Sequence, residues 1–451
     1  MNKKHNRRTF IKNMAVTGAA ATIMPTIVPS SVFGKSAPSN QINVGLIATG
    51  RQAIRVNLKQ FLGMDNVRVI AVNDPDHWRM EQAAKITNDR YTEKRGSSYK
   101  GVASYKDYRE LLANNDVDAV MVSSQDHWHV PHGIAAAMEG KHVSMEKALT
   151  ICINHGQALV DALNENNVHH RLDSEFRTKS YFSKAVGLVR GNVIGKVNKV
   201  VVGVPAPLNG SAPGPQPIME VPEELDYDMW LGPAFPAPYT ERRVHERHTY
   251  DVRPGWMRID DYCNGMITNW GAHLIDIALW GIDKEYESPV SVEGTGTFTK
   301  GLWNTVDSFN LTYAFADNTI VEYIIDDPYV KFIGDQGWLK AAFKKDLEAS
   351  DADILNGDYD EQFKNVLTDK EDFINSIIED RPSLEPMEVG HNVYRFTNMG
   401  LLAIKLGRKL HWDKQKKMFK DDTAANGMMY RSIREKYVDK KVVDFMKKYE
   451  V

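Results

Sequence analysis

The segment from residue 117 to residue 147 constrains the fold of this chain more than any other part of it. Its apolar run at 117–122 is short and rich in β-branched residues, which is typical of a parallel strand covered on both faces. Pro131 and Gly140 predict the start and the end of the helix that follows. A second strand then ends in Glu146-Lys147. Because ligands bind at the carboxyl ends of strands in open α/β sheets, the segment predicts an ionisable pair at a binding site.

Small residues follow an earlier predicted strand, residues 42–47, and a helix comes after them. Dinucleotide-binding folds need small residues at three places here, for a tight turn, for approach to the pyrophosphate and for helix packing. Gly50 takes the middle place, while Ala48 and Ala53 stand where glycine is usual. Ala48 is the less favourable replacement, because a Cβ narrows the backbone choices of a tight turn. We predict that Gly50 and Arg51 contact a dinucleotide.

The next predicted strand, residues 67–72, is followed by Asn73-Asp74-Pro75-Asp76. Asp74 comes 24 residues after Gly50, near the separation at which an acidic side chain binds the adenosine ribose hydroxyls. A carboxylate at this place would repel a 2′-phosphate, so the pattern favours NAD, while Arg79 leaves NADP as the alternative. An Asp-Pro turn that only ends a strand is the other interpretation of Asp74.

The segment that ends in Glu146-Lys147 resembles the Gfo/Idh/MocA family of nicotinamide-dependent sugar oxidoreductases. Family members carry Glu-Lys-Pro after this strand and a histidine in the loop before it. Here the motif stands as Glu146-Lys147-Ala148, with Ala148 as a departure from the pattern, and the loop histidine matches His129. The resemblance implies that Ser124, His129, Glu146 and Lys147 contact the cofactor, which is NAD or, as the alternative, NADP.

The resemblance covers about residues 41–430 and implies two domains of α/β class. Residues 38–172 are expected to form a Rossmann dinucleotide-binding domain. Residues 173–451 are expected to form an α+β domain with a large, open, mostly antiparallel sheet, which binds substrate and makes the contacts of a dimer or tetramer. Within it, residues 205–260 are rich in Pro, Gly, Trp and charge and predict a long loop, and loops of this length tend to be functional.

Residues 265–276 predict a turn of small residues that enters an amphipathic helix. His273 and Asp276 are three residues apart and are therefore neighbours on one helix face. The family has a histidine that matches His273, and the branch that this chain resembles has the aspartate too. Many members place an aspartate where Asn269 stands, and asparagine neither takes up nor releases a proton. A buried histidine with a structural role is the alternative for His273.

Oxidation of a sugar hydroxyl needs the alcohol carbon near the cofactor ring, an acceptor for the hydroxyl proton and exclusion of water. The resemblance assigns catalysis to two residues: Lys147 would bind or deprotonate the hydroxyl, and His273 would hold or relay its proton. Asp276 is expected to orient the histidine or to pack the helix. The residues predicted at the substrate are Arg177, Trp256, Asn269, Trp270 and Asp276, the tryptophans offering apolar faces for sugar C–H surfaces.

The first 37 residues have the features of a cleavable export signal. They contain the pair Arg7-Arg8 and an apolar stretch at 14–24 that is too short to span a bilayer. We expect export by the twin-arginine route to the periplasm, with no stable membrane anchor. Without these residues 50 basic and 59 acidic residues remain, a net charge of −9, which argues against nucleic acid as a partner.

Metal chemistry has little support in the sequence. His127, His129 and His132 are close together, but no carboxylate or cysteine stands at convincing ligand spacing, so no metal site is predicted. The two cysteines, Cys152 and Cys263, are far apart in sequence and form no disulfide framework.

Three functions fit these features. The favoured one is an exported, NAD(P)-dependent oxidoreductase that acts on a ring hydroxyl of a sugar or glycoside and holds its cofactor tightly. The second is an NAD-dependent glycosidase, in which oxidation of a ring hydroxyl is transient and permits elimination. The third is a sugar-binding protein on a dehydrogenase fold, since fold does not dictate function; the presence of Lys147 and His273 argues against it.

Overall fold

The computed structural model describes residues 41–207 and 214–450, and the described residues from Ile42 onward form one compact unit. The export signal expected at residues 1–37 lies outside the described residues. Within the described ranges, none of the helices combines the length and the apolar character needed to cross a membrane.

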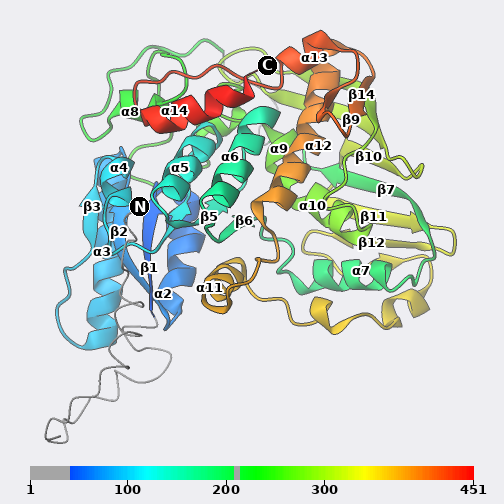
Figure 1. Ribbon diagram of the computed structural model, residues 1–451, viewed down its shortest axis with the longest axis horizontal. Coiled ribbons are helices and arrows are strands. Elements are labelled where there is room, and N and C mark those ends of the chain that lie inside the picture. The colour runs from blue at the N-terminus through cyan, green and yellow to red at the C-terminus, as the bar shows by residue number, and fades with distance from the viewer. Residues whose placement is uncertain (1–40, 208–213, 451) are drawn as a thin grey trace, which may run out of the picture. The chain divides into compact units, whose positions relative to one another are not determined.

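The N-terminal sheet has six parallel strands in the order β3-β2-β1-β4-β5-β6 (Figure 1). The order reverses between β1 and β4, which is the point where ligands bind in such sheets. The sheet therefore confirms the predicted Rossmann arrangement. Its strands are β1 (Ile42–Ile47), β2 (Val67–Asn73), β3 (Ala103–Tyr105), β4 (Ala119–Val122), β5 (His142–Glu146) and β6 (His170–Asp173).

Helices cover both faces of this sheet, and Figure 1 shows α5 and α6 side by side on one of them. The helical elements of this part are η3 (Ala53–Asn57), α2 (Leu58–Gly63), α3 (His77–Arg95), α4 (Tyr108–Leu112), α5 (Asp126–Met138) and α6 (Ile153–Glu165). The prediction that Pro131 opens a helix is wrong, because α5 begins at Asp126 and contains the proline. A proline lacks only its own N–H bond, and the surrounding burial of α5 outweighs that loss.

The C-terminal sheet has nine strands in the order β13-β12-β11-β7-β10-β9-β8-β14-β15. All neighbouring pairs run antiparallel except β7 and β10, so the prediction of a large, mostly antiparallel sheet is confirmed. The strands are β7 (Val197–Val204), β8 (Ser291–Phe298), β9 (Val306–Ala314), β10 (Ile320–Ile325), β11 (Tyr329–Gly334), β12 (Trp338–Ala342), β13 (Glu348–Ala349), β14 (Leu410–Asp413) and β15 (Met418–Phe419).

Helices α7 (Ser180–Arg190), α10 (Gly271–Gly281) and α12 (Met387–Leu406) share the largest hydrophobic core with this sheet. The alternation of buried and partly exposed residues along β10 and β11 shows that one face of the sheet meets this core. The remaining elements are α8 (Tyr227–Leu231), η4 (Gly255–Arg258), α9 (Met266–Asn269), η5 (Ala352–Asn356), η6 (Glu361–Phe363), α11 (Asp369–Glu379), α13 (Thr423–Gly427), α14 (Lys440–Met446) and η7 (Lys447–Tyr449).

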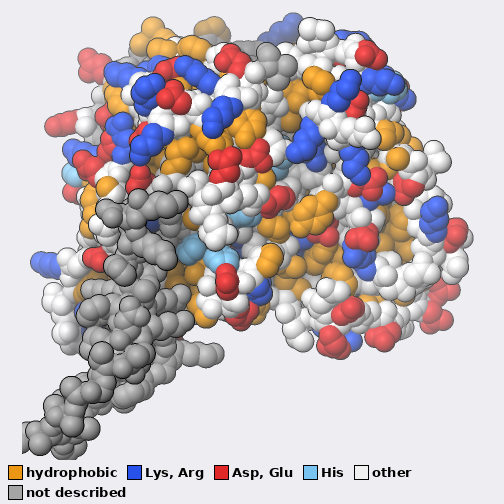
Figure 2. Space-filling model, in the orientation of Figure 1, with side chains coloured by type: hydrophobic (Ala, Val, Ile, Leu, Met, Phe, Trp, Pro, Cys, Tyr) orange, Lys and Arg blue, Asp and Glu red, His pale blue; other side chains and the backbone are white. Residues whose placement is uncertain are grey.

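Two late segments of the chain pack on the N-terminal part. Phe373 and Ile374 of α11 join the core formed by β1, β2 and α2, and Val442 and Met446 of α14 join the core beneath α5 and α6. In Figure 1 the red α14 lies next to α5. Figure 2 shows basic and acidic side chains interspersed over this face. The two sheets are therefore joined by shared cores as well as by the chain between β6 and α7.

Candidate active site

A cavity of about 360 Å³ opens at the carboxyl end of the N-terminal sheet and is closed by the C-terminal part of the chain. Its volume falls in the usual range for small-molecule sites. The ends of β1, β2, β4 and β5 supply one wall, while α9, α10 and the loop before them supply the other. The cavity brings together ten of the predicted site residues: Gly50, Arg51, Asp74, Ser124, Glu146, Lys147, Trp256, Asn269, Trp270 and His273.

The turn after β1 has the form that a dinucleotide needs. Ala48 has φ 65°, the left-handed conformation that favours glycine, and its N–H donates to the carbonyl of Asn73 at 2.9 Å. Gly50 faces open space, because no atom lies within 4 Å of the place that a Cβ would take. A pyrophosphate can therefore approach this backbone at the start of the following helix, where free N–H groups favour anions. The residues present fit the cofactor.

Asp74 is fixed at the end of β2 and lines the cavity. Its Oδ2 accepts hydrogen bonds from the Thr49 N–H at 2.7 Å and from the Thr49 hydroxyl at 3.2 Å, and its Oδ1 accepts one from the Asp76 N–H at 2.8 Å. Burial and the neighbouring Asp76 carboxylate raise the pKa of Asp74 to about 6. The side chain is thus held in one orientation at the place predicted for a ribose contact.

A part of the long loop, residues 245–250, packs over the start of α3. His245 contacts the Asp76 carboxylate at 2.9 Å, and the Arg79 guanidinium donates to the carbonyl groups of Glu246 and Thr249 at 3.1 and 3.0 Å. Arg79 is therefore engaged by the loop as well as by Asp76, at 3.5 Å. His245 lines the cavity, so this loop encloses the end that holds Asp74.

Glu146 and Lys147 differ in their surroundings although they are neighbours in sequence. Glu146 is buried and accepts a hydrogen bond from the Asn57 amide at 3.0 Å; burial, opposed by Lys370, raises its pKa to about 8. Lys147 lines the cavity, and no residue in the described part of the chain is its hydrogen-bond or ion-pair partner. The peptide bond from Lys147 to Ala148 is cis. The ammonium group of Lys147 is free to meet a ligand.

His273, in the N-terminal half of α10, lines the same cavity as Lys147. Its Nδ1 bonds to the carbonyl of Ser174, and because a carbonyl only accepts, Nδ1 carries the proton. Burial, followed by the charge of Lys147, holds the pKa of His273 well below its usual value, so the ring is neutral. Phe176 stacks on the ring with centroids 4.4 Å apart. Nε2 is then an unprotonated acceptor in a fixed position.

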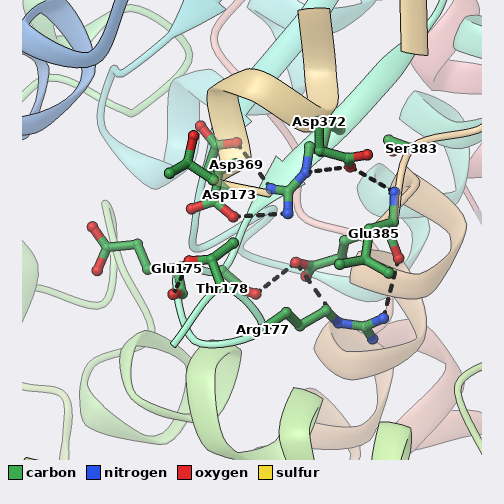
Figure 3. Close-up of polar contacts among 12 residues, drawn as sticks. Asp173, Glu175, Arg177, Thr178, Asp369, Asp372, Ser383 and Glu385 are labelled. Carbon is green, nitrogen blue, oxygen red and sulfur yellow. Dashed lines mark hydrogen bonds and ion pairs between the residues drawn. The ribbon is translucent and has the colours of Figure 1, made fainter. Parts of the chain in front are cut away.

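Two of the residues predicted at the substrate lie away from the cavity. Arg177 and Asp276 are fully buried and do not line the cavity; they form a two-point ion pair, with Nη2 to Oδ1 at 2.6 Å and Nε to Oδ2 at 2.8 Å. Figure 3 shows Glu385 beside the same guanidinium. The Ser174 hydroxyl lies 3.2 Å from Asp276 Oδ2 and 2.5 Å from Glu385 Oε2, and it donates its one proton to one of these carboxyl groups at a time. The pair therefore fixes Ser174, whose carbonyl orients the ring of His273.

The prediction that His129 contacts the cofactor does not fit its position, because the residue does not line the cavity. The ring is fully buried outside the cavity lining, with Nδ1 at the carbonyl of Ala148 and Nε2 at 2.9 Å from the carbonyl of Ser124. Burial lowers the pKa of His129 to about 4, so the neutral ring donates to one of these carbonyls at a time. His129 fixes the backbone on both sides of the cofactor cleft. The neighbouring His132 bonds to the Ser124 hydroxyl at 3.0 Å.

Comparison with known families tests the assignment. Residues 42–173 match the model of the Gfo/Idh/MocA oxidoreductase family for its NAD-binding Rossmann fold, and residues 211–439 match the model for its C-terminal alpha/beta domain. The second match alone covers half of the chain. The chain belongs to the Gfo/Idh/MocA oxidoreductase family. The resemblance seen in the sequence is confirmed, and the N-terminal domain is of the NAD-binding type.

Curated relatives of this family member align over part of their length. Glycosyl hydrolase family 109 protein 2 of Shewanella sp. strain ANA-3 is 30% identical over 169 residues, 35% of this chain and 36% of that protein. The alpha-N-acetylgalactosaminidase of Shewanella oneidensis is 28% identical over 153 residues, 33% of this chain and 32% of the relative. The chain thus spans about a third of the length of the curated relatives it matches.

Solved structures share the fold over most of their length. The aldose-aldose oxidoreductase from Caulobacter crescentus, complexed with glycerol, has a TM-score of 0.58 and 16% identity, covering 82% of this chain and 99% of that one. Levoglucosan dehydrogenase in complex with NADH and levoglucosan has a TM-score of 0.61 and 15% identity, with the same coverage. The WlbA dehydrogenase from Bordetella pertussis, with NADH and UDP-GlcNAcA, has a TM-score of 0.61 and 13% identity, covering 83% and 99%.

Sequence reasoning missed two acidic residues of this site. Glu175 lines the cavity in a left-handed conformation, φ 63°, and accepts a hydrogen bond from the Gln52 amide at 2.6 Å. Asp126 lies buried behind Lys147 at the first residue of α5, and burial raises its pKa to about 7. Only the position of Asp126 in the histidine-bearing loop was a usable signal. Glu175 lies in an irregular turn that no periodic pattern marks.

Proposed function

We propose that this protein is an exported, NAD-dependent oxidoreductase that acts on a ring hydroxyl of a sugar or glycoside. One observation carries the proposal: the unpaired Lys147 and the neutral His273, with its Nε2 unprotonated, line a single cavity that extends to Asp74. The groups that bind a hydroxyl oxygen and accept its proton therefore lie in the same cavity as the expected ribose contact. Family membership supports NAD as the cofactor.

Each residue of the cavity has its own role in the proposed reaction. NAD, when bound, supplies the acceptor for the hydride of the alcohol carbon. The Lys147 ammonium binds the hydroxyl oxygen and stabilises negative charge on it, and Nε2 of His273 accepts the hydroxyl proton. Trp256 and Trp270 present apolar ring surfaces to the sugar, and Asn269 supplies amide hydrogen bonds beside them. Closure by these rings excludes water from the reacting carbon.

Retention of the cofactor is part of the proposal. The contacts of residues 245–250 with α3 enclose the adenosine end of the cavity, and release of the nucleotide would require this loop to move. Export through the twin-arginine route moves folded proteins, so a nucleotide enclosed in the cytoplasm would travel with the enzyme to the periplasm. The carboxylate of Asp74 favours NAD over NADP, because it would repel a 2′-phosphate. A dimer or tetramer built on the open face of the large sheet completes the proposal.

Glycoside hydrolysis through transient oxidation is the second candidate. The family 109 hydrolases among the curated relatives favour it, although the alignment covers only part of them. Asn269, which replaces the aspartate of many dehydrogenases of the family, favours it as well. In this reaction a ring ketone would acidify the neighbouring C–H, and Glu175, which lines the same cavity, is placed to take up a proton.

The first test is mass spectrometry of the nucleotide released when protein purified from the periplasm, without added cofactor, is denatured. Stoichiometric NAD supports the proposal, whereas protein without nucleotide contradicts a retained cofactor and favours a binding protein. Lys147→Ala should keep the nucleotide and lose about 10²–10³-fold in turnover, since it removes the group that binds the hydroxyl oxygen and stabilises its negative charge. Lys59→Ala, exposed on α2, is the matched control. Near-normal turnover of Lys147→Ala would remove the lysine from the mechanism.

A second assay separates the two reactions. The NAD-loaded protein is mixed with a panel of p-nitrophenyl glycosides, and nitrophenol and NADH are followed together. A dehydrogenase accumulates one equivalent of NADH for each enzyme and releases no nitrophenol. A glycosidase releases nitrophenol over many turnovers while NADH stays below one equivalent.

A further inference from the structure

A second cavity of about 340 Å³ adjoins the active-site cavity. The two cavities meet at four side chains that line both of them: Arg51, His245, Val252 and Arg253. The rest of the second cavity is formed by residues 241–258 and by Trp303, all from the C-terminal part of the chain. Nothing in the mechanism above uses this space.

Four arginines line this second cavity, and they have no acidic partner. Arg51, Arg242, Arg253 and Arg258 form no ion pair with any residue in the described ranges, and the buried Nε of Arg51 has no hydrogen-bond partner there. Three carboxylates share the lining. Asp251 is paired with Arg55, Glu241 accepts a hydrogen bond from the Arg247 N–H at 3.1 Å, and Glu246 is exposed at the rim.

The arginines repel one another. Burial, followed by the charges of Arg253 and Arg242, holds the pKa of Arg258 below its usual value. Burial, followed by the charges of Arg55 and Arg253 and opposed by Asp251, also holds the pKa of Arg51 below its usual value. Arg253 is thus close to both, at the junction of the two cavities. Positive charge held together without a partner is typical of a site that receives an anion.

The backbone around these arginines is firmly held. The Arg258 guanidinium stacks over the ring of Trp303 at 4.3 Å, and the indole N–H of Trp303 donates to the carbonyl of Arg242 at 3.2 Å. Gly255 permits this packing, because a Cβ there would lie 1.8 Å from the same carbonyl oxygen. The Arg258 guanidinium is therefore oriented before any ligand arrives, which reduces the entropy lost on binding, while Arg242 and Arg253 are exposed at the mouth of the cavity.

We propose that Arg242, Arg253 and Arg258 bind an anionic group of the substrate, a carboxylate or a sulfate ester carried by the saccharide at a distance from the oxidised hydroxyl. This inference rests on the proposed function and specifies its substrate class as acidic saccharides. Guanidinium groups suit the task because their fork of N–H donors matches planar or tetrahedral oxyanions. The pyrophosphate of the cofactor is the other anion within reach of Arg51, so the test has to separate the two.

The site itself is tested with sodium sulfate as the probe on NAD-loaded protein, by isothermal titration against sodium chloride of equal ionic strength. We expect saturable sulfate binding to the wild type and to Arg247→Gln, the control, whose arginine pairs with Glu224 outside the cavity. In the double variant Arg242→Gln, Arg258→Gln the affinity should fall at least tenfold. Equal binding in the double variant, or none in the wild type, overturns the site.

The substrate assignment is tested on the same proteins with glucuronate and glucose as paired ligands. The loaded wild type should bind glucuronate at least tenfold more tightly than glucose, and the double variant should lose this preference. No preference in the wild type overturns the assignment. So does a double variant that is purified with less NAD than the wild type, because the arginines then serve the cofactor. A wild type without nucleotide contradicts the proposed function instead, while sulfate binding to it is measured as before.

Discussion

Asp126 gives the sharpest test of the electrostatics of this site. It is the first residue of α5, its side chain is only 2% exposed, and its Oδ2 has no hydrogen-bond partner within the described residues. Burial raises the pKa of Asp126 to about 7, although a hydrogen bond with the Cys263 side chain and the charge of Lys147 each lower it in part. Asp126→Asn keeps the shape of the side chain and removes the titration. The effect of this substitution on stability should therefore depend on pH.

The sign and size of this pH dependence follow from the pKa of Asp126 in the folded protein and in the unfolded chain. An aspartate in an unfolded chain titrates near 3.9, so between about pH 4 and pH 7 the folded protein binds more protons at Asp126 than the unfolded chain does. Stability then falls as pH rises through this window, by about 1.4 kcal/mol for each pH unit. Between pH 5 and pH 8 the wild type should lose about 3 kcal/mol relative to Asp126→Asn, nearly all of it below pH 7.

The assay is urea unfolding of both proteins at pH 5, 6, 7 and 8. The free energy of unfolding of Asp126→Asn minus that of the wild type should rise with pH and level off above about pH 7. Asp89→Asn, which removes an exposed carboxylate that pairs with Lys85 on α3, is the control for the loss of a surface charge. A flat difference for Asp126→Asn would show that the carboxyl is ionised throughout, and that the buried surroundings of Lys147 accommodate a full charge.

Three further outcomes are expected. Ala48→Gly should raise the free energy of unfolding by about 1 kcal/mol, measured by urea denaturation, because glycine relieves the left-handed strain at φ 65°; a loss of stability would contradict this. Asp74→Ala should weaken NAD binding by about 10–100-fold in titration calorimetry, and unchanged affinity would refute the ribose contact. Arg177→Ala should cost about 3–5 kcal/mol in the same denaturation assay, because Asp276 would remain as a buried charge without its main partner.

The fold was predictable because its signals are local. The short β-branched strands, the small residues after β1 and the acidic end of β2 each follow from the needs of one strand or turn. The rule that ligands bind at the carboxyl edge of a parallel sheet then places Gly50, Asp74 and Lys147 at one cavity. The family resemblance added His273, which no local pattern distinguishes from a structural histidine.

The errors concern charged residues whose partners are distant in sequence. Arg177 and Asp276 were assigned to the substrate, but they are separated by 99 positions and bury each other. A sequence pattern does not show whether a charge meets a ligand or a second charge. Sequence analysis missed Arg242, Arg253 and Arg258 for the same reason. They lie in a loop without periodicity and come together only when the loop folds against Trp303.

The proposed catalytic pair comes from opposite parts of the chain, Lys147 from the end of β5 and His273 from α10, so their separation depends on what joins those parts. Buried ion pairs contribute to this join beside the shared cores. Arg171 pairs with Asp173, Asp369 and Asp372, the three carboxylates that Figure 3 labels near one another, and Arg177 pairs with Asp276.

Buried pairs of this kind add little net stability, because desolvation offsets most of the attraction, but they tolerate few geometries. Ser174 lies between the two groups and transmits this geometry to His273 through its carbonyl. We therefore infer that the buried charges fix the tautomer and the position of His273, the proposed proton acceptor. Packed apolar side chains could not specify this geometry as narrowly.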